Sequence, residues 1–277
     1  MNHITITQSD SQVPVLGFGT WQITGQAGVN AVENALDIGY RHIDTAQVYG
    51  NEAEVGTAIS NGNVAREYLF LTTKVWRDAV SANTIIPSVE TSLKKLQTDY
   101  VDLLLIHWPQ TDVSVAKTLE SFIKLKDSGK VKNIGVSNFN VSQMQQAVAC
   151  GAAPITNQVE YHPLLSQQPV LDFCQQNDMF LTAYSPLAQG EATNNMVLQQ
   201  IGVKYGKTAA QVCLRWLIQQ QNVVAIPKAS SRGNAEANFN IFDFELAEID
   251  LAAIAQLPKD RRLCNPPFAP LWDKAAA

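Results

Sequence analysis

Four residues suited to proton transfer and carbonyl chemistry lie beside the ends of successive apolar runs in the chain. Asp44 ends one run, Lys74 lies near the end of the next, and His107 ends the one after that, while Tyr49 follows Asp44 in the next loop. Reduction of a carbonyl needs a hydride on carbon and a proton on oxygen, and a tyrosine with a pKa of about 10 is a poor donor near neutrality. A neighbouring ammonium lowers that pKa, a carboxylate holds the ammonium, and a histidine can orient the carbonyl. The four residue types together therefore fit carbonyl reduction.

Each of these residues alone has a purely structural explanation. Asp44 could cap a helix, Lys74 could extend along the surface of its strand, and His107 could pack in a loop. Tyr49 could be an ordinary turn aromatic. Four such coincidences at matched positions are much less expected than one, so we favour the catalytic interpretation.

Eight short apolar runs alternate with longer amphipathic segments, which predicts the elements that position these residues. The predicted strands are Val15–Phe18, Arg41–Asp44, Leu69–Val75, Val101–His107, Asn133–Val136, Ile155–Glu160, Phe180–Tyr184 and Val223–Pro227. The predicted helices are Ala31–Ile38, Glu52–Ser60, Thr84–Leu96, Val115–Asp127, Ser142–Ala149, Pro169–Gln176, Met196–Tyr205 and Ala209–Gln220.

This alternation predicts an α/β fold in which parallel strands close into a single (β/α)₈ TIM barrel over residues 1–277. A doubly wound open sheet is the alternative, but Gly17-Phe-Gly19-Thr-Trp-Gln22 lacks the third glycine of the dinucleotide-binding motif. Ile4–Thr7 and Gln12–Val15, around Ser9-Asp10-Ser11, predict a β-hairpin at the barrel floor. In such a barrel the catalytic residues lie at the carboxyl ends of the strands.

Composition limits the classes of function. The formal net charge of −5 argues against a nucleic-acid binder, and the longest apolar runs are too short to span a bilayer. The four cysteines form no CxxC pair, which disfavours a disulfide or zinc framework. His3, His42 and His162 show no metal-ligand spacing, so we expect no metal site. No signal peptide is visible, and we expect a cytoplasmic protein, a monomer, whose partner is a small molecule.

Three motifs resemble the signatures of the aldo-keto reductase family. The resemblance extends, in order, across nearly the whole chain. The motifs are Asp44-Thr-Ala-Gln-Val-Tyr49-Gly-Asn51-Glu52, Thr73-Lys74-Val-Trp76 and Leu105-Ile-His107-Trp108-Pro109. Within the family, the chain is most similar to the bacterial 2,5-diketo-gluconate and methylglyoxal reductases. The resemblance implies Tyr49 as general acid, Lys74 as the group that tunes its pKa, Asp44 as the partner of the lysine and His107 as the residue that orients the carbonyl.

The same resemblance implies a nicotinamide cofactor. Gln158 inside an apolar strand already needs polar partners, because a buried amide is costly without them. In the family pattern Ser137, Asn138 and Gln158 bind the carboxamide, and Tyr184 stacks on the ring. The further cofactor residues implied are Thr20, Trp21, Asp44, Ser185, Pro186, Leu187, Gln189, Gly190, Ile226, Lys228, Ser230, Ser231, Arg232 and Asn238.

Lys228 and the small polar residues after it imply a site for the adenosine 2′-phosphate and hence NADPH, because a helix start with nearby cations favours phosphate. The chain departs from the family pattern at Ala229, Asn234 and Ala237, where serine, arginine and glutamate are usual. Arg232 is a candidate substitute for the missing arginine. These departures leave use of NADH open.

Aromatic residues are candidates for the walls of the substrate pocket. The segment Asn265–Trp272 of the proline-rich tail resembles a substrate-side flap, and we expect the final alanines to be disordered. The predicted substrate-binding residues are Trp21, Tyr49, Trp76, His107, Trp108, Asn138, Phe268 and Trp272.

Three alternatives of function remain at this point. The same fold and cofactor could reduce a C=N (imine) bond, since the family resemblance implies only that the intact His107 disfavours reduction of C=C bonds. A non-catalytic barrel subunit could sense the nicotinamide pool. A barrel hydrolase or isomerase would need a metal cluster, a nucleophile elbow or a carboxylate pair at strand ends, and the sequence shows none.

Overall fold

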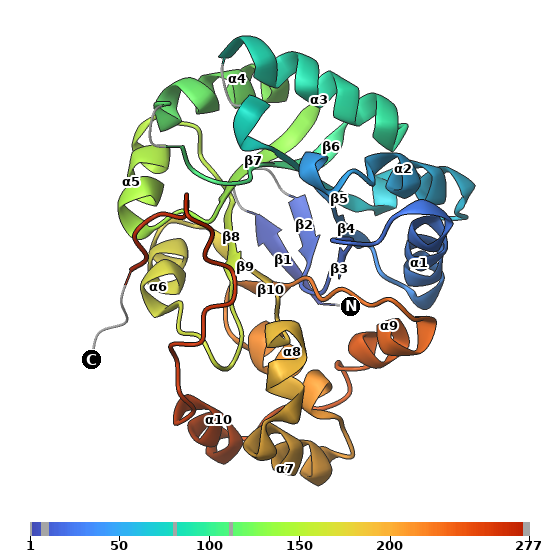
Figure 1. The fold of residues 1–277 in the computed structure, drawn as a ribbon, viewed down its shortest axis with the longest axis vertical. Coiled ribbons are helices and arrows are strands. Elements are labelled where there is room, and N and C mark those ends of the chain that lie inside the picture. Colours follow the sequence, from blue (N-terminus) through green and yellow to red (C-terminus); the bar gives the residue numbers. More distant parts are fainter. Residues whose placement is uncertain (1, 7–10, 80–81, 111–112, 274–277) are drawn as a thin grey trace.

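A computed structural model describes residues 2–6, 11–79, 82–110 and 113–273, and its centre is an eight-stranded parallel sheet ringed by helices (Figure 1). The strands follow one another in chain order around the sheet, as a barrel requires. They are β3 (Phe18–Gly19), β4 (His42–Asp44), β5 (Phe70–Val75), β6 (Val101–Ile106), β7 (Val131–Ser137), β8 (Thr156–Glu160), β9 (Phe180–Tyr184) and β10 (Val223–Ala225).

The first and last strands meet, so the sheet closes. Gly17 N donates to the Ala225 carbonyl at 2.8 Å, Ala225 N donates to the Val15 carbonyl at 2.9 Å, and Gly19 N donates to the Pro227 carbonyl at 3.0 Å. A Cβ at Gly19 would lie 2.8 Å from the Ile226 carbonyl oxygen, which explains the glycine at this close approach. The predicted barrel is confirmed, and the open sheet is wrong.

Strand boundaries agree with the sequence within a few residues, and the first strand differs most. The prediction places it at Val15–Phe18, whereas regular pairing with β4 covers only Phe18 and Gly19. Leu16 instead forms an isolated parallel bridge with Ala225 on the other side. The residues of this apolar run therefore pair with β4 on one side and with β10 on the other.

The predicted N-terminal hairpin is present, one residue earlier than expected. β1 (His3–Ile6) pairs antiparallel with β2 (Ser11–Pro14). Val13 is buried in a cluster with residues of four barrel strands, and the Asn133 amide donates to the Ser11 hydroxyl at 3.0 Å. The hairpin thus closes the amino-terminal end of the barrel. Ser9 and Asp10 of the predicted turn lie outside the described residues.

The helices surround the strands (Figure 1), and each of the eight predicted helices is present. The first helix begins earlier than predicted, at Gly25, and the sequence analysis did not delimit two helices near the C-terminus, α9 (Arg232–Phe239) and α10 (Glu248–Ala255). No helix in the described ranges is long and apolar enough to cross a membrane. The helices are α1 (Gly25–Ile38), α2 (Glu52–Asn61), α3 (Ala82–Leu96), α4 (Val115–Asp127), α5 (Val141–Ala149), α6 (Gln168–Gln176), α7 (Met196–Tyr205), α8 (Ala209–Gln219), α9 (Arg232–Phe239) and α10 (Glu248–Ala255).

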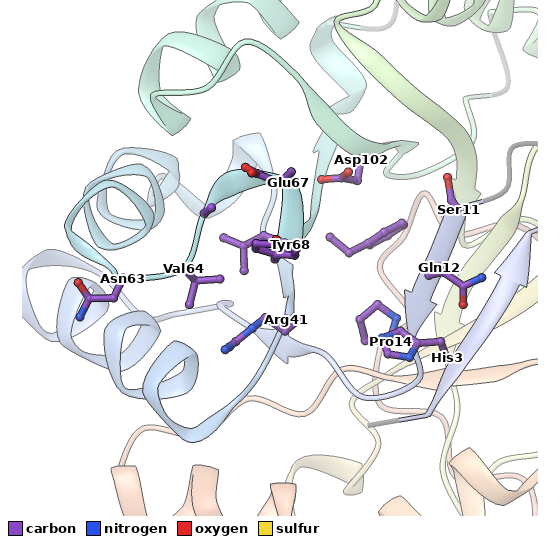
Figure 2. Close-up of a pocket in the computed structure, with 13 residues that line it drawn as sticks. His3, Ser11, Gln12, Pro14, Arg41, Asn63, Val64, Glu67, Tyr68 and Asp102 are labelled. Carbon is purple, nitrogen blue, oxygen red and sulfur yellow. The ribbon is translucent and has the colours of Figure 1, made fainter.

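A hollow of about 710 Å³ lies at the hairpin end of the barrel. Arg41 and Phe70 in its lining lie at the starts of β4 and β5, and Tyr68 stands among the lining residues (Figure 2). Asp44 and Lys74 lie at the other ends of the same strands. The hollow is therefore separate from the predicted catalytic residues.

Candidate active site

The predicted catalytic residues meet at the carboxyl ends of β4, β5 and β6, which are neighbours in the sheet. Lys74 Nζ donates to Asp44 Oδ1 at 2.5 Å and to the Tyr49 hydroxyl at 3.4 Å. It also donates to the Thr45 carbonyl at 2.8 Å. Lys74 and Asp44 are fully buried, so their pair sits in a low-dielectric site where charge interactions are strong.

The loop that carries Tyr49 is held by a residue to which the sequence assigned no role. Asn51 is buried, its amide donates to the carbonyls of Thr20 at 2.7 Å and Ile23 at 2.8 Å, and its oxygen accepts from the Thr45 hydroxyl at 2.8 Å. Tyr49 itself ends the short 3₁₀ helix η1 (Gln47–Tyr49). Asn51 thereby ties the loops after β3 and β4 together and fixes the segment that presents the phenol.

Burial changes the expected electrostatics of Tyr49. It raises the pKa of the phenol, and the Lys74 ammonium opposes this rise without cancelling it. The Lys74 ammonium lowers the pKa of the phenol, in the direction that the sequence predicts, but burial outweighs it and the net pKa is raised. Burial alone would lower the pKa of Lys74, but the Asp44 carboxylate and Tyr49 outweigh it and raise that pKa. The result is a protonated phenol beside a firmly charged ammonium.

His107 faces the same site as a neutral imidazole. Burial, and next the Lys74 charge, lower its pKa well below the usual value. Its ring packs edge-on against Tyr49 at a centroid distance of 5.7 Å and against Trp76 at 5.1 Å. Its Nδ1 has no hydrogen-bond partner among the described residues. A neutral imidazole beside the phenol can bond a carbonyl oxygen without competing for the proton.

Amide and hydroxyl groups from β8 and from the ends of β7 and β9 gather beside the predicted catalytic tetrad of Asp44, Tyr49, Lys74 and His107. Gln158 Nε2 donates to Asp44 Oδ2 at 2.8 Å, and the Ser137 hydroxyl donates to the Gln158 carbonyl at 2.8 Å. Asn138, in a left-handed conformation with φ 61°, donates to the His107 carbonyl at 3.0 Å and accepts from the Tyr184 hydroxyl at 2.8 Å. The structure therefore brings together all of these predicted cofactor residues.

A second group of predicted cofactor residues lies at the start of α9. Ser231 caps the helix by accepting from Asn234 N at 3.2 Å, and Lys228 is exposed nearby. Arg232 is not free: Nε donates to Glu236 at 2.9 Å, and its guanidinium lies 3.7 Å from the Asp37 carboxylate. Two carboxylates therefore partly neutralise the cation that the sequence offered for a phosphate.

The segment after β9, which carries the predicted residues Ser185 to Gly190, is a tight loop. Ser185 and Gln189 have φ of 47° and 52°, and Gln189 lies within the 3₁₀ segment η4 (Ala188–Asn194). Glu191 of η4 forms a bidentate pair with Arg261 of the tail, with both distances at 2.7 Å. This pair joins the loop to the C-terminal tail.

Four of the five predicted tryptophan and phenylalanine wall residues form one aromatic cluster over the tetrad. Phe268 contacts Trp76 at 6.1 Å and Trp108 at 5.4 Å, and Trp108 contacts Trp272 at 6.1 Å between ring centroids. Trp21 is separate, with 46% of its surface exposed and no ring contact to the cluster within the described residues. The tail segment 265–272 thus packs against Trp76 and Trp108 beside His107, and its role as a substrate-side flap stays a prediction.

Comparison with known proteins identifies the protein family to which the chain belongs. The model of the aldo/keto reductase family matches residues 15–259, which is most of the chain. This chain belongs to the aldo/keto reductase family. It is an oxidoreductase that acts on carbonyl groups.

Relatives of this aldo/keto reductase include two bacterial enzymes. Methylglyoxal reductase DkgB of Yersinia pestis is 43% identical over 94% of this chain and 99% of its own length. Glyoxal reductase of Bacillus subtilis is 42% identical over 91% of each chain. A crystal structure of a protein provisionally named 2,5-diketo-D-gluconic acid reductase B matches with a TM-score of 0.95 and 44% identity, over 99% of this chain and 98% of its own.

Aldo/keto reductases use nicotinamide cofactors, and the chemistry of the donor set here fits one. The amide and hydroxyl groups of Ser137, Asn138 and Gln158 suit a carboxamide, and the Tyr184 ring lies beside them through its bond to Asn138. No cluster of three metal-ligating side chains occurs in the part of the chain that the structure describes.

The anchor of the C-terminal tail is a feature of this reductase that the sequence did not reveal. Glu160, at the end of β8, is fully buried and accepts from Leu263 N at 2.8 Å and Cys264 N at 2.7 Å. His162 also bonds Glu160 at 3.0 Å. Burial alone would raise the pKa of Glu160, but the bonds from His162, Leu263 and Cys264 lower it overall. The buried carboxylate holds the tail at the barrel mouth.

Proposed function

We propose that this protein is an NADPH-dependent reductase of small carbonyl compounds, with Tyr49 as the general acid. The candidate substrates are small α-ketoaldehydes, diketo-sugar acids and aromatic aldehydes. The observation that carries the proposal is the position of Lys74, which reaches Asp44 at 2.5 Å and Tyr49 at 3.4 Å beside a neutral His107. The names of the relatives, methylglyoxal reductase and glyoxal reductase, support the substrate class.

In this mechanism the bound cofactor supplies the hydride, and the side chains manage the oxygen. His107 bonds the carbonyl oxygen and orients it beside the phenol. Tyr49 passes its proton to that oxygen as negative charge develops there. The Lys74 ammonium stabilises the phenolate that remains, and Asp44 keeps Lys74 charged and in position. The phenol is protonated beforehand, because burial raises its pKa.

The cofactor would lie along the ends of β7 to β10. Ser137, Asn138 and Gln158 would bind the carboxamide, with Tyr184 under the ring. The phosphates would lie near η4 and the start of α9, where backbone N–H groups and Lys228 favour negative charge. The remaining contacts are assigned to Thr20, Trp21, Asp44, Ser185, Pro186, Leu187, Gln189, Gly190, Ile226, Ser230, Ser231, Arg232 and Asn238.

Preference for NADPH over NADH is a hypothesis that rests on Lys228 and its neighbours. The pairing of Arg232 with Glu236 and Asp37 weakens the charge available to a 2′-phosphate. We therefore expect NADPH to be preferred while NADH is still used. The substrate would be enclosed by the aromatic cluster, Trp21 and Asn138, in a monomer that acts as one domain over residues 1–277.

The experiment that tests this proposal follows oxidation of NADPH in the presence of methylglyoxal, 2,5-diketo-gluconate and several aromatic aldehydes, and repeats it with NADH. Turnover that is faster with NADPH at equal concentration supports the proposal. A clear preference for NADH would overturn the cofactor assignment. Cofactor binding without turnover of any carbonyl would favour a sensing role, and turnover only of imines would favour C=N reduction.

A further inference from the structure

Two arginines stand at the mouth of the barrel, each stacked on an aromatic residue of the tail. Arg77 follows β5, and its guanidinium carbon lies 4.1 Å from the centre of the Phe268 ring. Arg262 belongs to the tail, and its guanidinium carbon lies 3.9 Å from the centre of the Trp272 ring. Trp108 contacts both of these rings, so the two cations flank the aromatic cluster above the tetrad.

Neither arginine forms an ion pair with a described residue. The neighbouring Arg261 shows the contrast, because it makes a bidentate pair with Glu191. In Arg262, Nη1 is buried and has no hydrogen-bond partner among the residues that the structure describes. A buried guanidinium N–H without an acceptor is costly, so this atom is a donor in need of a partner.

Two carboxylates that hold the tail form their hydrogen bonds with groups other than Arg262. Glu160 accepts from Leu263 N, Cys264 N and His162. Asp273 accepts from Val141 N at 2.8 Å at the start of α5. Burial lowers the pKa of Arg262, and the Glu160 charge only partly opposes this. Arg77 and Arg262 thus place two guanidinium groups without an ion pair to a described residue at the mouth of a protein whose formal net charge is −5.

Stacking fixes where the two guanidinium groups point and limits the freedom that they lose on binding a ligand. Arginine presents planar N–H pairs that match a carboxylate in a bidentate geometry. Trp76 joins the rim to the reaction site, since its ring contacts both Phe268 and His107. A small substrate whose carbonyl lies at His107 and Tyr49 would extend its other end along these rings towards the rim.

We propose that Arg77 and Arg262 form a carboxylate-binding rim, and that the preferred substrates are carbonyl compounds that also carry a carboxylate. This inference rests on the proposed function and narrows its substrate class. The rim residues bind the remote end of the substrate and take no part in proton transfer. Their contribution is expected mainly in KM, because contacts made equally in the ground and transition states leave kcat unchanged.

A matched pair of aldehydes tests the rim: 4-formylbenzoate, which is anionic, and its neutral methyl ester. We expect the unmodified protein to prefer the anion, and added salt to reduce that preference. Arg262→Gln and Arg77→Gln are each expected to lower kcat/KM for the anion by about 10- to 100-fold, mostly through KM, as loss of a charge-assisted hydrogen bond predicts. Values for the ester should change little. Arg262→Lys, which keeps the charge but not the planar donors, should recover part of the loss.

Lys124→Gln is the matched control, because Lys124 is exposed in the last turn of α4, at the floor end of the barrel. It removes one positive charge and should leave the ratio of kcat/KM for the two aldehydes unchanged. If Arg262→Gln does not fold, the comparison of the two aldehydes in Arg77→Gln tests the rim. Equal losses on both aldehydes, or no loss on either, would overturn the rim with the reductase intact. Absence of turnover of both aldehydes by the unmodified protein would overturn the proposed function and the rim with it.

Discussion

The Lys74 ammonium lies 3.4 Å from the Tyr49 hydroxyl, inside a site where burial raises the pKa of the phenol and the ammonium opposes that rise. In the proposed mechanism, burial keeps the proton on Tyr49 until a substrate oxygen accepts it. The ammonium then stabilises the phenolate that remains. The Asp44 carboxylate at 2.5 Å keeps the lysine charged while both steps occur.

The pH dependence of reduction follows from this pair. Because Tyr49 must be protonated and its pKa is raised, kcat/KM should hold through neutral pH and fall only on the alkaline side. Lys74→Met removes the charge that lowers the pKa, so the alkaline fall should move to still higher pH while the rate at neutral pH drops. Both effects are measured by kcat/KM across the pH range. The double variant Asp44→Asn/Lys74→Met is measured beside Lys74→Met, because it leaves no unpaired buried carboxylate. An alkaline fall that stays in place in Lys74→Met would contradict the assignment.

Stability towards acid should depend on His42. This buried residue has its pKa lowered to about 4, first by desolvation, from an ordinary value of 6.5. The unfolded chain therefore binds a proton that the folded one excludes, and the free energy of unfolding should fall as pH drops from 6.5 through 4. The expected loss is about 3 kcal/mol, from 1.36 kcal/mol per pKa unit. Denaturant unfolding of His42→Asn should show a shallower acid loss than the unmodified protein, and an equal slope would refute this role.

Cofactor preference should respond to the charges around Arg232. Glu236 pairs with Arg232 at 2.9 Å, so Glu236→Gln frees positive charge near the expected 2′-phosphate site. The ratio of kcat/KM with NADPH to that with NADH should rise in Glu236→Gln and fall in Arg232→Gln. Glu90→Gln, which breaks the exposed pair with Lys130, serves as the control and should leave the ratio alone. A ratio that is the same in all three variants would show that Arg232 does not contact the cofactor.

The tail anchor should affect substrate binding more than chemistry. Glu160→Gln weakens the bonds to Leu263 N and Cys264 N, at a cost of about 1–3 kcal/mol in stability for charge-assisted hydrogen bonds. Because the loosened tail carries Phe268 and Trp272, KM should rise several-fold with a smaller change in kcat. Glu191→Gln breaks only the exposed pair with Arg261 and should change stability little. If kcat falls while KM stays constant in Glu160→Gln, the anchor acts in another way.

The sequence predicted the barrel and the tetrad because both depend on local patterns. Apolar runs mark the buried strands, and polar residues at their ends mark the mouth. The first strand was misplaced because its run Val15–Gly19 divides its hydrogen bonds between two neighbouring strands. Helix α10 was missed because its support is distant in sequence, where Lys204 and Tyr205 bond Asp250.

Long-range partners also explain what was missed at the site. Glu160 gains its role only from Leu263 and Cys264, which are distant in the chain. The direction in which the pKa of Tyr49 shifts depends on how deeply the phenol is buried, which a sequence does not give. Arg232 has the residue type expected for a phosphate, but its pairing with Asp37 and Glu236 appears only after folding.

The central claim is tested most directly by the rate of methylglyoxal reduction with NADPH in the unmodified protein and in Tyr49→Phe. Removal of the hydroxyl leaves the packing of the ring but takes away the proton donor. We expect turnover in the unmodified protein, a loss of about 10²- to 10⁴-fold in Tyr49→Phe, and NADPH affinity that is largely retained. Full activity in Tyr49→Phe would contradict the account and show that another group protonates the oxygen.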